Sequence, residues 1–268
     1  MRLVIKIGTS TLAHPSGHLN IKRVEHLCKV IADIKNAGNE IIMVSSGAIG
    51  MGVGKLGLKS RPKDMPTKQA AAAVGQCELM YIYDKLFSEY HHNVAQLLIT
   101  NDNFKETEYY DNFINTLNKL LELQVIPVIN ENDTIATEEI AVGDNDTLAA
   151  KVAAAVEANL LILLSDIDGL YTADPHKHKD ATIIPEVNEL TADIMKLAEG
   201  AGTSQGTGGM ITKLNAARIC MEKDCEMVIT NGNNPDALYD VIDNKQVGTR
   251  FRKKQHERNV RKSQSLHR

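Results

Sequence analysis

Residues 3–10, with the sequence LVIKIGTS, join a short apolar run to a turn of small and polar residues. The run has the length and the branched side chains of a buried strand. A helical pattern over residues 21–36 follows, in which apolar residues recur at helical spacing: Val24, Leu27, Cys28, Ile31 and Ile34. A strand that is apolar on both faces and leads into a helix predicts a parallel sheet with helices on both sides.

The same alternation continues along the chain. It predicts strands at 40–45, 94–100, 125–129, 160–164 and 226–230, with 247–249 as an edge strand, and helices at 67–90, 107–123, 148–158, 210–223 and 236–243. The run 160–164, LLILL, is the most apolar strand, so we predict that it is central. Because no long Pro, Gly or Ser linker interrupts the pattern, the sequence favours an α/β fold with one continuous, mostly parallel sheet.

The composition is that of a globular protein. The chain has 268 residues, of which 43% are hydrophobic and 24% charged, and its aromatic content of 4% predicts a core of aliphatic side chains. No apolar run approaches the roughly 20 residues that a membrane-spanning helix needs. Lys6 interrupts the first apolar stretch, which argues against a signal peptide. We therefore expect a cytoplasmic protein with no membrane partner.

Charge and cysteine content narrow the possible classes of protein further. The four cysteines form no CxxC pair, so we expect thiols in a reducing compartment and no protein-bound metal. The net charge is −4, although residues 250–268 contain eight Lys or Arg and one acidic residue. Residues 1–249 are therefore acidic, which argues against general nucleic-acid binding. The basic tail could touch RNA or be a solvated end.

Small and polar residues follow four of the predicted strands. They occupy residues 8–10, 45–47, 130–133 and 165–166, with hardly a bulky side chain among them. In a parallel sheet these ends lie at one edge, where α/β proteins bind ligands. Loops are polar in any protein, but four consecutive instances favour a binding site at this edge.

Two lysines stand out by their positions. Lys6 ends an apolar strand just before Gly8, so its burial is costly unless it meets an anion; the alternative is a lysine that reaches solvent. Residues 206–213, GTGGMITK, form a glycine-rich loop before a helix, a setting that favours an anionic ligand. Lys213 lies in the first turn, against the helix dipole, and a phosphate would resolve that conflict. A merely flexible loop is the alternative.

Two further motifs are ambiguous or misleading. Residues 142–147, VGDNDT, begin a helix and could supply either an N-cap or a carboxylate for chemistry. Residues 52–57, GVGKLG, match a dinucleotide-binding pattern but do not directly follow the first strand. We predict a loop or a helix end there instead.

Taken together, two lysines, a glycine-rich anion cradle and an isolated carboxylate are the parts that phosphoryl transfer requires. That reaction depends on positioning and on neutralising the charge of the moving phosphoryl group. Mg²⁺ would be carried on the phosphates of ATP, with few protein ligands.

Six segments also match a known family in order and in register: 4–10, 44–49, 127–133, 142–146, 165–175 and 206–213. On these segments the chain resembles the amino acid kinase superfamily, and within it the branch that phosphorylates the γ-carboxylate of L-glutamate in the first step of proline biosynthesis. The KIGTS opening and the NENDT run distinguish that branch from relatives whose openings carry a Gly-Gly pair.

The resemblance implies a three-layer α/β/α sandwich over residues 1–249, with a glutamate-binding half at about 1–158 and an ATP-binding half at about 159–249. Lys6 and Lys213 would stabilise the phosphoryl group, and Asp146 would orient them. The substrate residues implied are Ser46, Gly47, Asn132, Asp133 and Asn145. The nucleotide residues implied are Lys6, Gly8, Ser165, Asp166, Thr207, Gly208, Gly209, Met210, Ile211, Thr212 and Lys213.

The resemblance also implies partners and regulation: ATP, L-glutamate, proline as a feedback inhibitor, and a homodimer or homotetramer. Many relatives carry an added C-terminal domain of a type associated with RNA modification, which we expect to be missing here. Two alternatives stay open. One is another superfamily member that acts on acetylglutamate, carbamate or uridylate, and the other is a non-catalytic nucleotide-binding or RNA-associated protein.

Overall fold

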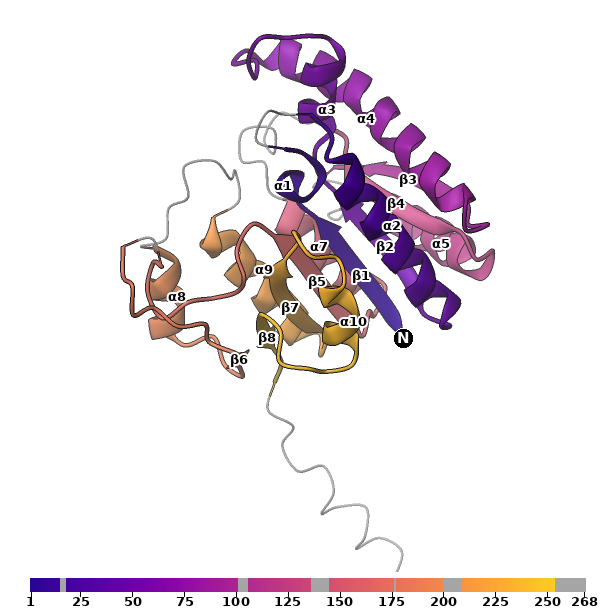
Figure 1. The fold of residues 1–268 in the computed structure, drawn as a ribbon. Helices are drawn as coiled ribbons and strands as arrows, with labels where there is room; N and C mark the ends of the chain where they lie inside the picture. The colour runs from indigo at the N-terminus through magenta and orange to yellow at the C-terminus, as the bar shows by residue number, and fades with distance from the viewer. Residues whose placement is uncertain (15–17, 101–105, 136–144, 176, 200–208, 254–268) are drawn as a thin grey trace, which may run out of the picture.

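The computed structural model describes residues 1–14, 18–100, 106–135, 145–175, 177–199 and 209–253. Within these ranges one eight-stranded sheet has the order β3-β4-β2-β1-β5-β7-β8-β6 (Figure 1). Its strands are β1 (Arg2–Ile7), β2 (Glu40–Ser45), β3 (Val94–Ile99), β4 (Ile126–Glu131), β5 (Leu160–Ser165), β6 (Glu186–Val187), β7 (Glu226–Asn231) and β8 (Thr249–Phe251). Only the β7–β8 pair is antiparallel, which confirms the mostly parallel sheet.

Strands β1 and β5 form the centre of the sheet, in register from Leu3 with Leu160 to Ile7 with Leu164. Every residue of β5 is buried. This confirms the prediction that the most apolar run is central, because a strand that is covered on both faces has no side chain directed to water.

Helices cover both faces of the sheet. They are α1 (Thr9–Leu12), α2 (Ile21–Asn36), α3 (Ala48–Lys55), α4 (Met65–Ser88), α5 (Thr107–Glu122), α7 (Asn145–Ala155), α8 (Ala192–Glu199), α9 (Met210–Glu222) and α10 (Ala237–Ile242). Alternate residues of β1 belong to different cores. Leu3 and Ile5 pack with α2, α4 and α10, whereas Val4 packs with α5, α7, α8 and α9. The fold is therefore a three-layer α/β/α sandwich. None of the described helices is both long and apolar enough to cross a bilayer.

The helix predicted at 21–36 has those bounds, and the five apolar residues that indicated it are all buried. The side chain of Asn20 caps its first turn by accepting a hydrogen bond from the Arg23 amide at 3.2 Å. The strand predicted at 40–45 also has those bounds, and the other predicted elements are correct in type and differ by one to three residues at one or both ends.

Five elements differ from the sequence predictions. Residues 9–12 form the short helix α1, and Ala48–Lys55 form α3, neither of which was predicted; residues 52–57 are the end of α3 and the turn after it, which confirms the predicted helix end. Strand β6 and helix α8 were not predicted either, and the two residues of β6 are too few to show an alternating pattern. Strand β8 lies between β7 and β6 instead of at the edge, and it continues to Phe251, two residues past the expected domain limit.

The glycines of residues 47–57 allow two helices to pack closely. A Cβ on Gly52 of α3 would lie 1.8 Å from the carbonyl oxygen of Ala71 in α4, and one on Gly75 would lie 1.7 Å from that of Ala48. Both distances are shorter than any non-bonded contact, so only glycine permits this approach. The dinucleotide-like motif is thus the end of a helix, as predicted, and its first glycine permits the close packing of α3 on α4.

Candidate active site

The ends of four parallel strands meet at one edge of the sheet. Ile7 is in register with Ser45 of β2 and with Leu164 of β5, and Val44 is in register with Ile129 of β4. The polar segments that follow these strands therefore lie side by side, as the sequence predicted. This is the edge at which parallel α/β sheets bind ligands.

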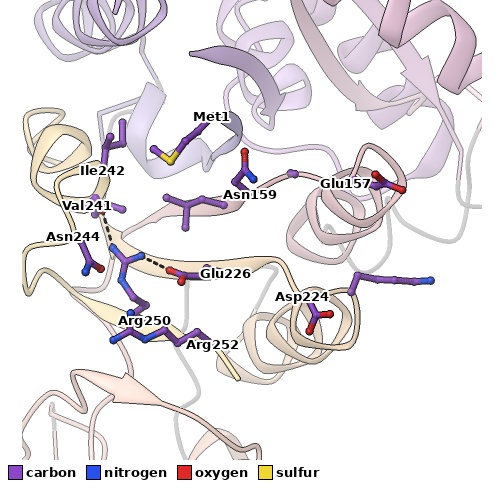
Figure 2. Close-up of a pocket in the computed structure, with 13 residues that line it drawn as sticks. Met1, Glu157, Asn159, Asp224, Glu226, Val241, Ile242, Asn244, Arg250 and Arg252 are labelled. Carbon is purple, nitrogen blue, oxygen red and sulfur yellow. Dashed lines mark hydrogen bonds and ion pairs between the residues drawn. The ribbon is translucent and has the colours of Figure 1, made fainter. Parts of the chain in front are cut away.

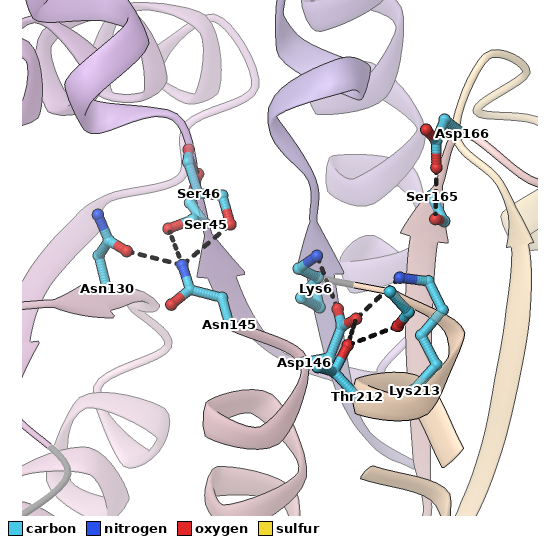
Figure 3. Close-up of polar contacts among 11 residues, drawn as sticks. Lys6, Ser45, Ser46, Asn130, Asn145, Asp146, Ser165, Asp166, Thr212 and Lys213 are labelled. Carbon is cyan, nitrogen blue, oxygen red and sulfur yellow. Dashed lines mark hydrogen bonds and ion pairs between the residues drawn. The ribbon is translucent and has the colours of Figure 1, made fainter. Parts of the chain in front are cut away.

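Two lysines share one buried carboxylate at this edge. Lys6 Nζ lies 2.7 Å from Asp146 Oδ1, and Lys213 Nζ lies 2.9 Å from Asp146 Oδ2 (Figure 3). The side chains of Lys6, Lys213 and Asp146 are 11%, 6% and 1% exposed. Strand β1, helix α7 and helix α9 thus place two cations, far apart in the sequence, over a single anion.

The ionisation of Asp146 follows from these neighbours. Burial alone would raise the pKa of its carboxyl group, but the charges and hydrogen bonds of Lys6 and Lys213 outweigh burial and hold that pKa well below its usual range. Asp146 therefore stays a carboxylate and keeps both ammonium groups at fixed positions. It also offsets the unfavourable position of Lys213 in the first turn of α9.

This pairing predicts an acid-dependent contribution to stability. Below the usual aspartate pKa the unfolded chain binds a proton that the folded protein does not bind, so stability falls as pH falls. We expect the stability gap between the natural chain and Asp146→Asn to narrow between about pH 5 and about pH 3. Urea unfolding of both proteins at several pH values measures the gap. A gap that stays constant over this range would contradict the pairing.

A second polar cluster surrounds Asn145, the first residue of α7. Its Nδ2 donates to Ser46 Oγ at 2.9 Å, to Asn130 Oδ1 at 2.9 Å and to the carbonyl oxygen of Ser45 at 3.2 Å (Figure 3). Gly47 follows Ser46 with a φ of 100°, in the left-handed region that glycine favours, and it is the N-cap residue before helix α3. The structure therefore brings Ser46, Gly47 and Asn145 together beside the two lysines.

The expected substrate residues Asn132 and Asp133 lie just past β4 and are half-buried. The two residues before them belong to the polar segment that was predicted to lie at this edge, but they were given no role of their own. Asn130 and Glu131 belong to β4 and are only 2% and 4% exposed. A buried, polar strand end next to a ligand edge is the signal that could have found them.

The expected nucleotide residues lie at the ends of β1 and β5 and at the start of α9. Gly8 donates its amide to the Leu164 carbonyl at 3.3 Å, and Ser165 Oγ donates to Asp166 Oδ1 at 3.1 Å. Thr212 Oγ1 donates to the Gly209 carbonyl at 2.8 Å and lies 3.3 Å from Asp146 Oδ2. Met210 and Ile211 begin α9. Thr207 and Gly208 lie outside the described residues.

A separate pocket of about 450 Å³ lies at the opposite edge of the sheet, lined by Met1, Leu160 and Glu226 at the starts of β1, β5 and β7 (Figure 2). The guanidinium group of Arg250 in this pocket already donates to Glu226 Oε2 at 2.6 Å and to the Val241 carbonyl at 2.7 Å. Because the Lys–Asp–Lys cluster and the polar strand ends lie at the other edge, this pocket is not the candidate active site.

Comparison with known proteins agrees with the fold. The model of the amino acid kinase family matches residues 1–231. The carbamate kinase from Giardia lamblia bound to AMP-PNP superposes with a TM-score of 0.66 at 18% identity, covering 94% of this chain and 98% of that one. The UMP kinase from Bacillus anthracis superposes with a TM-score of 0.60 at 16% identity, covering 93% and 95%. The chain belongs to the amino acid kinase family.

Sequence relatives narrow the assignment within that family. The glutamate 5-kinase of Caldanaerobacter subterraneus is 53% identical over 94% of this chain and 68% of its own length. The glutamate 5-kinase of Clostridium perfringens is 48% identical over 93% of this chain and 94% of its own length. At this identity and coverage, the chain belongs to the glutamate 5-kinase branch.

Proposed function

We propose that this chain transfers the γ-phosphoryl group of ATP to the γ-carboxylate of L-glutamate, which yields glutamyl 5-phosphate and ADP for proline biosynthesis. The observation that carries the proposal is the convergence of Lys6 and Lys213 on Asp146 at the ligand-binding edge of the sheet. The glutamate 5-kinase relatives supply the identity of the acceptor.

The reaction needs charge stabilisation more than proton transfer. An oxygen of the γ-carboxylate attacks the γ-phosphorus of ATP, a new P–O bond forms, and the bond to the bridging oxygen of ADP breaks. The acceptor is already ionised at neutral pH, because a glutamate side chain has a pKa of about 4.3. No general base is required, which agrees with a site built from lysines, amides and hydroxyl groups.

Lys6 and Lys213 would neutralise charge on the phosphoryl group as it moves between the two oxygens. Asp146 acts on the lysines, since its two carboxylate oxygens are occupied by their ammonium groups. It keeps the two cations at a fixed spacing before substrates bind. Little reorganisation is then needed during transfer, which is how a preorganised site lowers a barrier.

The positions of the two groups of polar residues suggest which half of the protein binds which substrate. Ser46, Gly47, Asn132, Asp133 and Asn145 would hold glutamate on the side of β2 and β4. Gly8, Ser165, Asp166 and residues 207–213 would hold ATP on the side of β5 and α9. The division at about residue 158 falls between α7 and β5, and both halves share the single sheet.

A magnesium ion would come with the nucleotide. The described residues contain no group of three or more metal-ligating side chains, and Asp146 is engaged by two lysines. Mg²⁺ keeps several waters and binds through phosphates with few protein ligands, so this residue set fits a metal that ATP carries. When bound, it would neutralise phosphate charge. Proline inhibition at or near the glutamate site and a homo-oligomer complete the proposal, on the strength of the family resemblance.

The direct test is to trap the acyl phosphate. Incubation with Mg-ATP, glutamate and hydroxylamine should yield a hydroxamate, and aspartate should yield little. Acetylglutamate, carbamate and UMP serve as competing acceptors in parallel reactions that report ADP release. Turnover with one of these instead of glutamate would assign the chain to a different acceptor, and ATP binding without any turnover would indicate a regulator.

The polar cluster around Asn145 leads to a separate prediction. We expect Asn145→Ala to raise KM for glutamate about tenfold or more, because it removes a polar contact to the substrate together with the hydrogen bonds that hold Ser46. KM for ATP should change by less than about twofold, since Asn145 lies on the other side of the lysines. Steady-state kinetics with each substrate varied separately makes this measurement. Equal changes in both constants would place Asn145 outside the glutamate site.

A further inference from the structure

A chain of hydrogen-bonded side-chain amides runs from the outermost strand, β3, to the candidate glutamate site. Asn145 Nδ2 donates to Asn130 Oδ1 at 2.9 Å, Asn130 Nδ2 donates to Gln76 Oε1 at 3.0 Å, and Gln76 Nε2 donates to Gln96 Oε1 at 3.0 Å. These residues come from α7, β4, α4 and β3. Figure 3 shows the inner end of this series of amides, where Asn130 and Asn145 meet.

All three hydrogen bonds run in the same direction. The two interior amides, Asn130 and Gln76, each accept on the oxygen from one neighbour and donate from the nitrogen to the next. The backbone amide of Glu131 also donates to Asn130 Oδ1 at 2.9 Å and favours the same orientation. If Asn130 turned over, it would lose that bond, its NH₂ group would face the NH₂ group of Asn145, and its oxygen would face the oxygen of Gln76. Asn130 is 2% exposed and Gln76 is 8% exposed, so water could not easily compensate for the lost bonds.

The backbone of Gln76 is itself held in place. The preceding residue, Gly75, is the one whose missing Cβ allows α4 to approach Ala48 of α3. Helix α4 therefore has no freedom to shift toward the site at this point. A side chain on a fixed backbone with fixed hydrogen-bond direction can orient its neighbour, as a supporting residue for a binding site must do.

The consequence reaches the substrate side. Because Asn130 Oδ1, Ser46 Oγ and the Ser45 carbonyl oxygen all accept from the NH₂ group of Asn145, the Oδ1 atom of Asn145 is not engaged by these three acceptors. Such a carbonyl oxygen can accept a hydrogen bond from an ammonium group. An α-amino acid substrate carries such a group, whereas a phosphate or a carboxylate would be repelled.

We propose that Gln76 is a positioning residue for the amino-acid substrate, which acts through Asn130 to hold the amide of Asn145 in the orientation that accepts the substrate's α-ammonium group. This inference rests on the proposed function, because it takes Asn145 to be a glutamate contact. It adds a residue outside the site, on helix α4, to the determinants of glutamate affinity.

The test compares three single variants. Gln76→Met keeps the side-chain length but removes the acceptor for Asn130, and it should raise KM for glutamate on the order of tenfold, with KM for ATP within about twofold. Gln76→Glu keeps an oxygen that accepts from Asn130, and the exposed Gln96 can turn its NH₂ group toward it. Its KM for glutamate should stay within about threefold of the natural value. Gln96→Met is the control at the outer end and should have less than about a twofold effect.

A double variant separates positioning from a general loss of structure. If Gln76 acts through Asn145, the Gln76→Met/Asn145→Ala protein should have the same KM for glutamate as Asn145→Ala alone. Three outcomes would overturn the proposal. The effects of the two substitutions on KM for glutamate could multiply in the double variant, Gln76→Met could have the natural KM for glutamate, or it could raise KM for glutamate and KM for ATP equally. Calorimetric titration of glutamate without ATP provides the same comparison without turnover. A natural chain that neither binds nor phosphorylates glutamate would overturn the proposed function as well, whereas an active one with an unaffected Gln76→Met overturns only the positioning role.

Discussion

Replacing Lys213 with alanine should lower kcat for glutamyl phosphate formation by a factor on the order of 10³, and Lys6→Ala should do the same. Each substitution removes one of the two cations that stand ready to neutralise the moving phosphoryl group. A positive charge stabilises a nearby negative charge most strongly where water is excluded. Both ammonium groups lie beside a carboxylate that is 1% exposed. Initial rates at saturating ATP and glutamate give kcat directly.

The stability of these variants should change much less than their activity. Asp146 keeps one lysine partner in either single variant, so neither leaves a buried charge without a counter-ion. Lys35→Ala is the matched control. Lys35 is also a buried lysine, 8% exposed, but it lies near the end of α2, with its Nζ 3.4 Å from Gln124 Oε1. It should leave kcat within about twofold of the natural value.

The contrast between these lysines decides between two readings of the cluster. If Lys6 and Lys213 served only to neutralise Asp146, their loss would affect unfolding and leave the rate of the folded fraction unchanged. If they act on the phosphoryl group, kcat falls while the unfolding midpoint stays close to that of Lys35→Ala. A kcat near the natural value in both Lys6→Ala and Lys213→Ala would contradict the proposed role of the two lysines in phosphoryl transfer.

The sheet could be predicted from the sequence because its signal is local. A strand such as β5, apolar at every position but the last, can only be covered on both faces, and a helix such as α2 shows its buried stripe within 16 residues. From these elements the common edge of the polar strand ends follows by geometry alone. Short elements carry no such signal, which is why β6 and α1 were missed.

The contacts within the site could not be predicted in the same way. Nothing in residues 142–147 themselves distinguishes an N-cap from a functional carboxylate. The family resemblance implied that Asp146 orients Lys6 and Lys213, and the contacts themselves appear only in the fold. The amide chain is harder still, since Gln76 and Asn130 are ordinary polar residues until α4 and β4 are packed together. Long-range pairings of this kind depend on the register of the whole sheet.

The glycines between α3 and α4 lead to the second large effect. Gly75→Ala should destabilise the protein by about 3 kcal/mol or more, because the new Cβ would lie 1.7 Å from the Ala48 carbonyl oxygen, a backbone atom that no rotamer change can move. The helices would have to separate. Urea unfolding followed by circular dichroism measures the loss as a lower midpoint at an unchanged slope.

Gly50→Ala is the control, at a glycine of α3 whose Cβ would not meet α4. Gly50 lies in α3, and the nearest atom to its Cβ would be Thr9 Cγ2 at 3.8 Å, an ordinary contact. Alanine is favoured over glycine in a helix by about 1 kcal/mol, so this variant should be neutral or more stable. Since α3 starts directly after Ser46 and Gly47, any Gly75→Ala protein that folds should also bind glutamate more weakly, whereas Gly50→Ala should not. Equal stability of the two variants would show that α3 and α4 do not pack as closely as described.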